Sequence, residues 1–173
     1  MKKIFLVLSC LIFLSGCGTE NSDESSANFS DDSQELPIEL SLGERKWQMS
    51  LPKNWETVPA KPQKGIIFLA RFGSQNLVIS NEVGNDSDLI KTLLETTKKS
   101  LDMIEPISQT EDTLIFRGKL SATTPQREFY QKVLLGPENR YLLVSCSQEV
   151  VNLEKLDCPE ILNSIYLKEG ETE

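Results

Sequence analysis

The sequence predicts an α+β domain in which a central antiparallel sheet is packed by one long amphipathic helix and a short C-terminal helix. Three observations support this fold class. Short segments from residue 36 onward alternate apolar and polar side chains, which is typical of strands. Residues 86–104 instead repeat apolar side chains every three or four positions, which indicates a helix. The chain has 173 residues, of which 39% are hydrophobic and 25% charged, and this is enough for one folded domain.

Two hairpins are expected to open the domain. Residues 36–42 and 45–51 both alternate, and Gly43 and Glu44 between them are typical turn residues. Residues 65–72 and 76–83 repeat the pattern around a Gly-Ser-Gln turn. Prolines at positions 52, 59 and 62 predict an irregular link between the two hairpins.

The helical segment follows the second hairpin. Asp86 or Ser87 can cap its first turn, and Pro106 is expected to end it. Its charged side chains fall largely on one face. The opposite, apolar face is formed by Ile90, Leu93, Leu94, Thr97, Leu101 and Ile104. This pattern predicts a helix that covers one side of the sheet.

The rest of the domain is predicted as three strands and a short helix. The strands are expected at residues 113–121, 127–135 and 140–147. The helix is expected at 158–165, with Asp157 as its cap and Pro159 in its first turn. The domain would then span 36–167 and leave a charged tail at 168–173.

The amino terminus has the parts of an export signal. A basic head precedes an apolar run at residues 4–14, which as a helix would cover only about 16 Å, roughly half of a bilayer core. The residues Leu14-Ser15-Gly16-Cys17 resemble the lipobox of bacterial lipoproteins. That resemblance implies a signal peptide at 1–16 and a Cys17 that carries acyl chains of the palmitate kind. The alternatives are an ordinary secretory signal with a chance cysteine, or an uncleaved anchor.

A lipidated Cys17 would hold the protein on a membrane, because two or more acyl chains give stable anchoring. The expected location is the bacterial cell membrane or outer membrane, with the domain facing the periplasm or the cell exterior. Residues 17–35, with six acids and no basic residue, are expected to form a flexible tether. The net charge of -8 and the absence of a basic stripe exclude nucleic acid as an expected partner. The sequence contains no His, so neither imidazole catalysis nor His-containing metal sites are available within this chain.

Two stretches of the domain resemble the PsbP-like domain family. One is Leu51-Pro52-x-x-Trp55 after an early strand, and the other is the strand at 141–146 that leads to the helix at 158–165. The resemblance implies a PsbP-like sandwich over about 36–167. It also implies an assembly or adaptor role rather than catalysis: family members stabilise photosystem subunits, bind a small GTPase or serve as envelope lipoproteins. The metal-binding His residues of photosynthetic relatives have no counterpart here.

Cys146 and Cys158 can form a disulfide in an oxidising envelope. With 11 residues between them, closing this loop would contribute about 2–4 kcal/mol of stability. A redox pair, a thiolate activated at a helix N-terminus and two free thiols are the alternatives. Trp47 and Trp55 are interpreted as packing residues, with a stacking surface for a ligand as the alternative.

The sequence therefore predicts a membrane-anchored envelope lipoprotein whose domain is a non-catalytic binding or assembly module with an envelope protein as partner. It predicts neither a catalytic site nor a metal or cofactor. The alternative function is a carrier of a small apolar ligand or lipid, and a hydrolase is the third hypothesis. A carrier would need a cavity between sheet and helix, for which the candidate wall residues are Ile66, Phe68, Ile90, Leu94 and Leu101.

Overall fold

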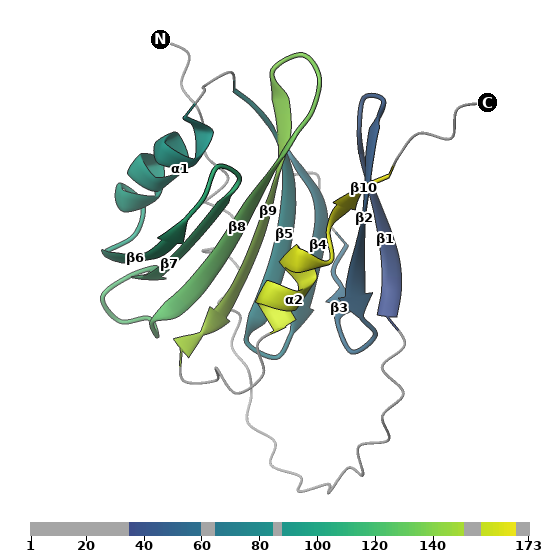
Figure 1. Cartoon of the computed structure of the whole chain (residues 1–173). Coiled ribbons are helices and arrows are strands. Elements are labelled where there is room, and N and C mark those ends of the chain that lie inside the picture. The colour runs from purple at the N-terminus through teal and green to yellow at the C-terminus, as the bar shows by residue number, and fades with distance from the viewer. Residues whose placement is uncertain (1–34, 60–64, 85–87, 151–156, 169–173) are drawn as a thin grey trace, which may run out of the picture.

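The computed structural model describes residues 35–59, 65–84, 88–150 and 157–168 (Figure 1). Its elements, in chain order, are β1 (Glu35–Leu42), β2 (Arg45–Pro52), β3 (Glu56–Thr57), β4 (Ile66–Phe72), β5 (Gln75–Val83), α1 (Leu89–Lys98), β6 (Met103–Gln109), β7 (Thr113–Lys119), β8 (Arg127–Leu135), β9 (Arg140–Glu149), α2 (Asp157–Asn163) and β10 (Tyr166–Leu167). The domain is mostly sheet with two short helices, so the α+β class is confirmed.

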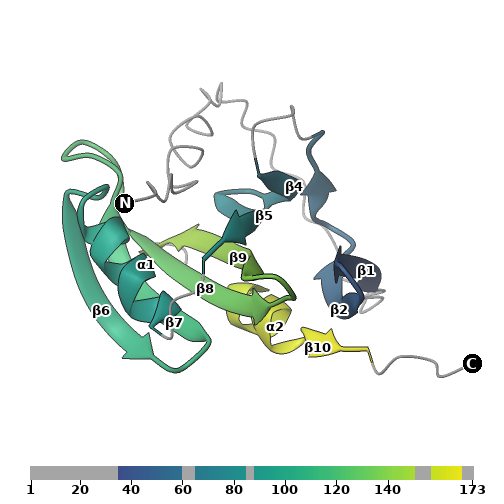
Figure 2. The same ribbon diagram turned by 90° about the horizontal axis from the view of Figure 1, so that it is seen from above.

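The strands form two sheets in which every pair is antiparallel. The larger sheet has the order β3-β4-β5-β9-β8-β7-β6, and the smaller has the order β1-β2-β10. The small sheet and α1 lie at opposite ends of the molecule (Figures 1 and 2). α2 packs against β8 and β9 of the large sheet and against β2 of the small one.

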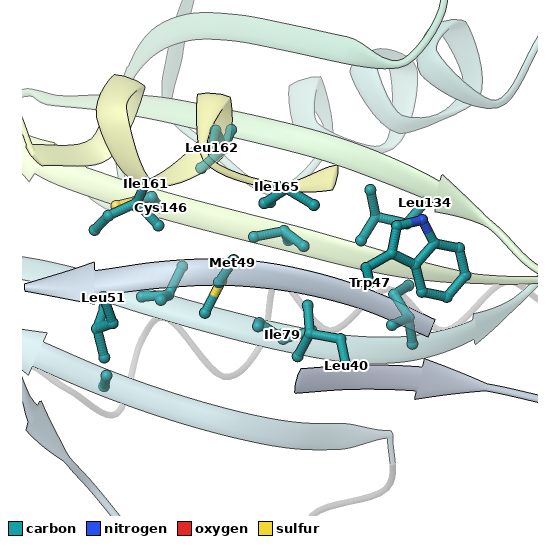
Figure 3. Packing of buried hydrophobic residues seen from close by; sticks show 14 of the residues in the cluster. Leu40, Trp47, Met49, Leu51, Ile79, Leu134, Cys146, Ile161, Leu162 and Ile165 are labelled. Atoms are coloured by element: carbon teal, nitrogen blue, oxygen red, sulfur yellow. The ribbon is translucent and has the colours of Figure 1, made fainter. Parts of the chain in front are cut away.

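Each face of the large sheet packs into its own apolar cluster, because side chains alternate between the two faces along a strand. The α2-side core joins the large sheet to α2 and the small sheet (Figure 3). Its buried residues include Trp47, Met49, Tyr130, Leu134, Leu142, Val144, Cys146, Ile161 and Leu162. The α1-side core joins the other face to α1. Its buried residues are Val78, Ile90, Leu93, Leu101, Leu114, Phe116, Phe129, Val133, Tyr141 and Leu143.

Both predicted hairpins are present. β1 pairs with β2 without a register break, and Gly43 turns the chain with a φ of 62°. Gly73, with a φ of 55°, turns β4 into β5. A positive φ favours glycine, which has no Cβ to clash with the backbone. The strand predicted at 127–135 coincides with β8.

The prediction of one long helix at 86–104 is wrong. α1 has ten residues, and residues 103–109 instead form β6, the edge strand that pairs with β7. Ile104 satisfied the helical spacing by coincidence, since it reaches the same α1-side core from a strand. Pro106 does not end the helix but lies within β6, where an edge strand tolerates a residue without an N–H. Asp86 and Ser87 lie outside the described residues, and Asp88 at the N-cap makes no side-chain capping hydrogen bond.

The C-terminal helix is also shorter than predicted. α2 ends at Asn163, and the chain then adds the two-residue strand β10 to β2. The first residue of the predicted charged tail, Lys168, continues this pairing, because its N–H donates to the carbonyl of Lys46 at 2.8 Å. The remaining tail residues lie outside the described part of the chain.

The sheet edges resist the addition of further strands. β3 and β10 have only two residues each, and β6 carries Pro106 and a register shift next to it. In β1, Pro37 lies opposite Ser50, whose own N–H donates to Ser164 rather than to β1. The nitrogen of residue 37 therefore points to the open side, where proline offers no donor. Prolines and irregularities at edges disfavour pairing with another chain.

Candidate functional site

The predicted lipidation residue, Cys17, lies outside the described residues. Cys146 and Cys158 are joined in a disulfide, with their Cα atoms 5.5 Å apart. Both are fully buried. The bond ties β9, a central strand of the large sheet, to the first turn of α2.

The two tryptophans are buried side chains rather than a stacking surface, as the packing interpretation predicted. Trp47 is part of the α2-side core. Trp55 lies against Phe72, with ring centroids 6.5 Å apart. Its indole N–H donates to Asp157 Oδ2 at 3.2 Å, so this carboxylate is bound to a side chain that precedes it by 102 residues.

The structure separates one residue from the predicted cavity wall. Ile66, Ile90, Leu94 and Leu101 all belong to the α1-side core, whereas Phe68 packs on the α2 side. The cause is a register shift between residues 66 and 68, where the pairing of β4 with β5 is irregular. A bulge changes the face to which the following side chains point.

The α1 side of the central strands carries an unusual number of polar side chains. We call this surface the α1-side polar face. Strand alternation and register place on it Asn76, Ser80 and Glu82 of β5, Arg127 and Gln131 of β8, and Ser145 and Ser147 of β9. The α2 side of the same three strands also carries polar side chains, but its central residues Leu77, Ile79, Leu142, Val144 and Cys146 are apolar and buried. Polar groups in the centre of a sheet need partners, and this asymmetry marks the α1 side as the candidate site.

Two acceptors on this face have no hydrogen-bond partner in the part of the chain that the structure describes. Gln131 is 1% exposed, and its Nε2 donates to Ser145 Oγ at 3.1 Å, which leaves Oε1 unused. Oε1 of Glu82 is the second. Burial raises the pKa of the Glu82 carboxyl, and the hydroxyl of Ser80 partly offsets this effect. Both atoms are enclosed by the surrounding side chains, so a bound molecule would reach them only where those side chains move aside.

Arg127 closes one end of the α1-side polar face and has its donors engaged. Its Nη2 donates to the carbonyl of Ser74 and to the carbonyl and hydroxyl oxygens of Ser147, the latter two at 3.2 and 3.3 Å. Nη1 lies 3.5 Å from Glu149 Oε1. Burial lowers the pKa of Arg127, and Glu149 opposes that shift. These contacts fix Arg127 between β8, β9 and the β4–β5 turn, so it is not a free anion-binding group.

A second polar cluster lies on the α2 side of β8. Nε of Arg117 donates to Glu128 Oε2 at 2.8 Å, and the hydroxyl of Tyr130 donates to Glu128 Oε1. Burial, and then the hydrogen bond to Glu128, raise the pKa of Tyr130. Gln148, the cross-strand neighbour of Glu128, is buried with both amide atoms unpaired in the described residues. With its carboxylate held on both oxygens, this cluster serves packing more than chemistry.

Sequence reasoning missed the α1-side polar face. Alternation identified the strands but did not say which of their faces would meet the core. A signal was available: Gln131, Ser145 and Ser147 interrupt the apolar runs of β8 and β9 at alternate positions. Only the register shows that these positions lie on one face of adjacent strands.

The described residues contain no group of three or more Cys, Asp or Glu side chains arranged to hold a metal ion. Within the same residues, no helix combines the length and apolar character that a membrane crossing requires.

Comparisons with known proteins identify fold relatives. No protein-family model matches the chain, and no curated protein matches it. Cyanobacterial PsbP from Synechocystis sp. PCC 6803 is 12% identical, and the match covers 83% of this chain and 99% of that one with a TM-score of 0.48. LpqN of Mycobacterium tuberculosis, described as involved in cell envelope biogenesis, is 13% identical over 80% of this chain and 93% of its own, with a TM-score of 0.50. At such low identity the likeness to LpqN shows a shared fold.

Proposed function

We propose that the chain is a membrane-anchored envelope lipoprotein whose domain is a non-catalytic binding or assembly module. The observation that carries the binding role is the α1-side polar face, where Gln131 and Glu82 each present an acceptor without a partner. A partner that supplies N–H or O–H donors would satisfy both when the side chains that enclose them move aside on binding. An interface gains from such pairing because an unpaired buried acceptor costs about 1–3 kcal/mol.

The placement in the envelope rests on the sequence of the amino terminus. The basic head, the apolar run and the lipobox-like Leu14-Ser15-Gly16-Cys17 support export and lipidation. The acidic stretch at 17–35 supports a tether between the lipid and the domain. The fold shared with LpqN, itself described as an envelope biogenesis protein, supports the same compartment. The domain would face the periplasm or the cell exterior.

The proposal that the module is non-catalytic is supported by the bonds that the reactive side chains make within the fold. Cys146 and Cys158 are bound to each other. The carboxylate of Glu128 is bound by Arg117 and Tyr130, and the carboxylate of Asp157 by Trp55. A hydrolase would instead need a nucleophile and a base within hydrogen-bond reach. Robust labelling of a single serine by a hydrolase-directed probe would contradict the proposal.

The anchor is tested by replacing Cys17 with Ala in cells and separating membrane and soluble fractions. We expect the wild-type chain in the membrane fraction and the C17A chain either unprocessed or soluble after processing. A processed C17A chain that still sediments with membranes would refute lipid anchoring. Ser15→Ala is the matched control, since it changes a neighbouring residue and leaves the acylated sulfur in place.

A carrier of a small apolar ligand or lipid is the second candidate. It is favoured by the common location of Ile66, Ile90, Leu94 and Leu101 in the α1-side core, beside the unpaired acceptors of the polar face. An amphiphile with an apolar body and a donor-bearing head would suit both features. Organic-solvent extraction of the purified protein, followed by mass spectrometry, distinguishes the two functions. A stoichiometric lipid supports the carrier, and its absence supports the binding module.

A further inference from the structure

The C-terminal segment 157–168 joins the two sheets on the side opposite α1. We call this segment the clasp; it consists of α2, β10 and Lys168. α2 contacts β8 and β9 of the large sheet and β2 of the small sheet. Figure 3 shows Ile161 and Ile165 of the clasp on the side of Met49 and Leu134, and Leu162 and Trp47 belong to the same core. The clasp therefore covers the α2-side core where the two sheets meet.

Apart from side-chain packing, the clasp is held by hydrogen bonds, an ion pair and a disulfide. At its start, the indole N–H of Trp55 donates to Asp157 Oδ2 at 3.2 Å. In its middle, Lys132 Nζ donates to the carbonyl of Leu162 at 3.3 Å. At its end, the N–H of Ser50 donates to Ser164 Oγ at 2.9 Å, and β10 pairs with β2 over two residues. Lys168 adds a backbone hydrogen bond to the carbonyl of Lys46 at 2.8 Å and an ion pair with Glu39 at 3.0 Å. Besides the backbone, the Cys146–Cys158 disulfide links the first turn of α2 covalently to β9.

The clasp depends on the disulfide because its helix and its strand are both too short to be stable alone. α2 has seven residues, well below the length at which a helix is stable without tertiary support. β10 is too short to pair by itself. The disulfide holds Cys158 next to the strand on which α2 packs, and so it reduces the entropy that the segment must lose to dock.

We propose that the clasp is redox-dependent: it is closed when Cys146 and Cys158 are a disulfide and open when they are thiols. In the closing step, the two thiols lose two protons and two electrons and form one S–S bond. A protein disulfide of the thiol–disulfide oxidoreductase class accepts the electrons and becomes a dithiol. Opening uncovers the α2-side core and frees the outer edge of β2. The α1-side polar face lies on the other side of the sheet and keeps its structure.

The proposal implies that the chain is exported first and that the clasp closes afterwards. This order rests on the export proposed above. In a reducing cytosol the precursor would keep its clasp open, and the two sheets would be joined fully only in an oxidising compartment. The redox dependence itself does not need export. It is measured on purified protein, so the failure of the anchor test would leave its result unchanged.

Hydrogen–deuterium exchange of the full chain in detergent tests the proposal. The oxidised wild type is compared with C146S/C158S, in which serine has nearly the size of a reduced cysteine. We expect amides of the clasp to exchange on the order of 100-fold faster in the variant, while amides of β5 and β9 keep their protection. Ser164→Ala is the control: it removes a contact at the far end of the clasp but keeps the disulfide, and we expect a much smaller increase.

Three results would overturn the proposal. Equal protection of residues 157–168 in both proteins would show that packing alone closes the clasp. Loss of protection in β5 and β9 as well would show that the disulfide supports the whole fold and not a local device. Intact mass after alkylation without reductant is the accompanying measurement on the wild type, and two alkylated thiols at Cys146 and Cys158 would also refute the closed, oxidised state.

Discussion

The side chain of Leu42 fills the space beside Gly136. A Cβ atom on Gly136 would lie 2.3 Å from Leu42 Cδ2 and 2.8 Å from Leu42 Cγ. This contact joins the tip of the β1–β2 hairpin to the tip of the β8–β9 hairpin. Arg45 adds a hydrogen bond from Nη1 to the carbonyl of Leu135 at 2.7 Å. The small sheet is thus attached to the large one at the hairpin tips as well as through the clasp.

Gly136→Ala is therefore expected to reduce the free energy of unfolding by about 1–3 kcal/mol, because the added methyl group overpacks a buried contact. Urea denaturation measures the loss. Leu42→Ala alone should cost about 2–5 kcal/mol, since Leu42 is buried. In the double variant the methyl group has room, so the combined loss should be smaller than the sum of the single losses. Strict additivity would contradict the contact.

The hydrogen bond from Tyr130 to Glu128 predicts a pH effect. Burial and this bond raise the pKa of Tyr130 above its ordinary value of 10.0, so the folded state holds its proton more tightly than the unfolded state. The resulting stability is complete below about pH 10 and is lost as the pH rises toward the raised pKa. Denaturation at pH 8 and pH 11 should show a smaller decline for Tyr130→Phe than for wild type. At pH 8 that variant should be less stable by about 1 kcal/mol.

The carboxyl of Glu82 should make the stability of the fold depend on pH in the acidic range. Its pKa is raised by burial, so ionisation is less favourable in the folded state than in the unfolded state. The stability of the wild type relative to Glu82→Gln should fall as the pH rises from about 4, through the raised pKa, to 7. The change should be below about 1 kcal/mol, since the carboxyl is partly exposed to water. Glu44→Gln, in an exposed turn, is the control. An equal pH dependence in both variants would refute the assignment.

Pro37 is expected to prevent the domain from forming dimers through the edge of β1. Its nitrogen faces the open side of β1, where it cannot donate a hydrogen bond to another strand. Pro37→Thr restores the N–H and should increase dimer formation at high protein concentration in sedimentation velocity. Pro52→Thr, in β2 and therefore not on that edge, is the matched control. A monomeric Pro37→Thr variant at all concentrations would contradict the protective role of Pro37.

The sequence predicts most of the strands because alternation and turn residues are local signals. The hairpin turned at Gly43 and the strand at 127–135 follow from such signals alone. The pairing of Cys146 with Cys158, which the spacing allowed, is present in the structure. The length of the helix could not be predicted, because Ile104 fits a helical period and a strand equally well. Its assignment depends on pairing with β7, which is a long-range contact.

The candidate site could not be predicted from the local pattern of the sequence. Gln131 and Ser145 become neighbours only through the register of β8 and β9. Phe68 does not lie on the expected cavity wall, because the pairing of β4 with β5 shifts register between residues 66 and 68. The residues around this shift do not indicate it. The side of the sheet that a side chain faces can be predicted only when the pairing and register of the strands are known.

Photo-crosslinking in the native membrane tests the central claim most directly. A photoreactive amino acid is placed on the α1 side at Leu135, which is 56% exposed, or at Arg71, and on the outer face of the small sheet at Lys46 as the control. The account predicts one discrete adduct from the α1-side positions and none above background from Lys46. An equal yield of the same adduct from Lys46, or no protein or lipid adduct from any position, would contradict a binding module that uses the α1-side polar face.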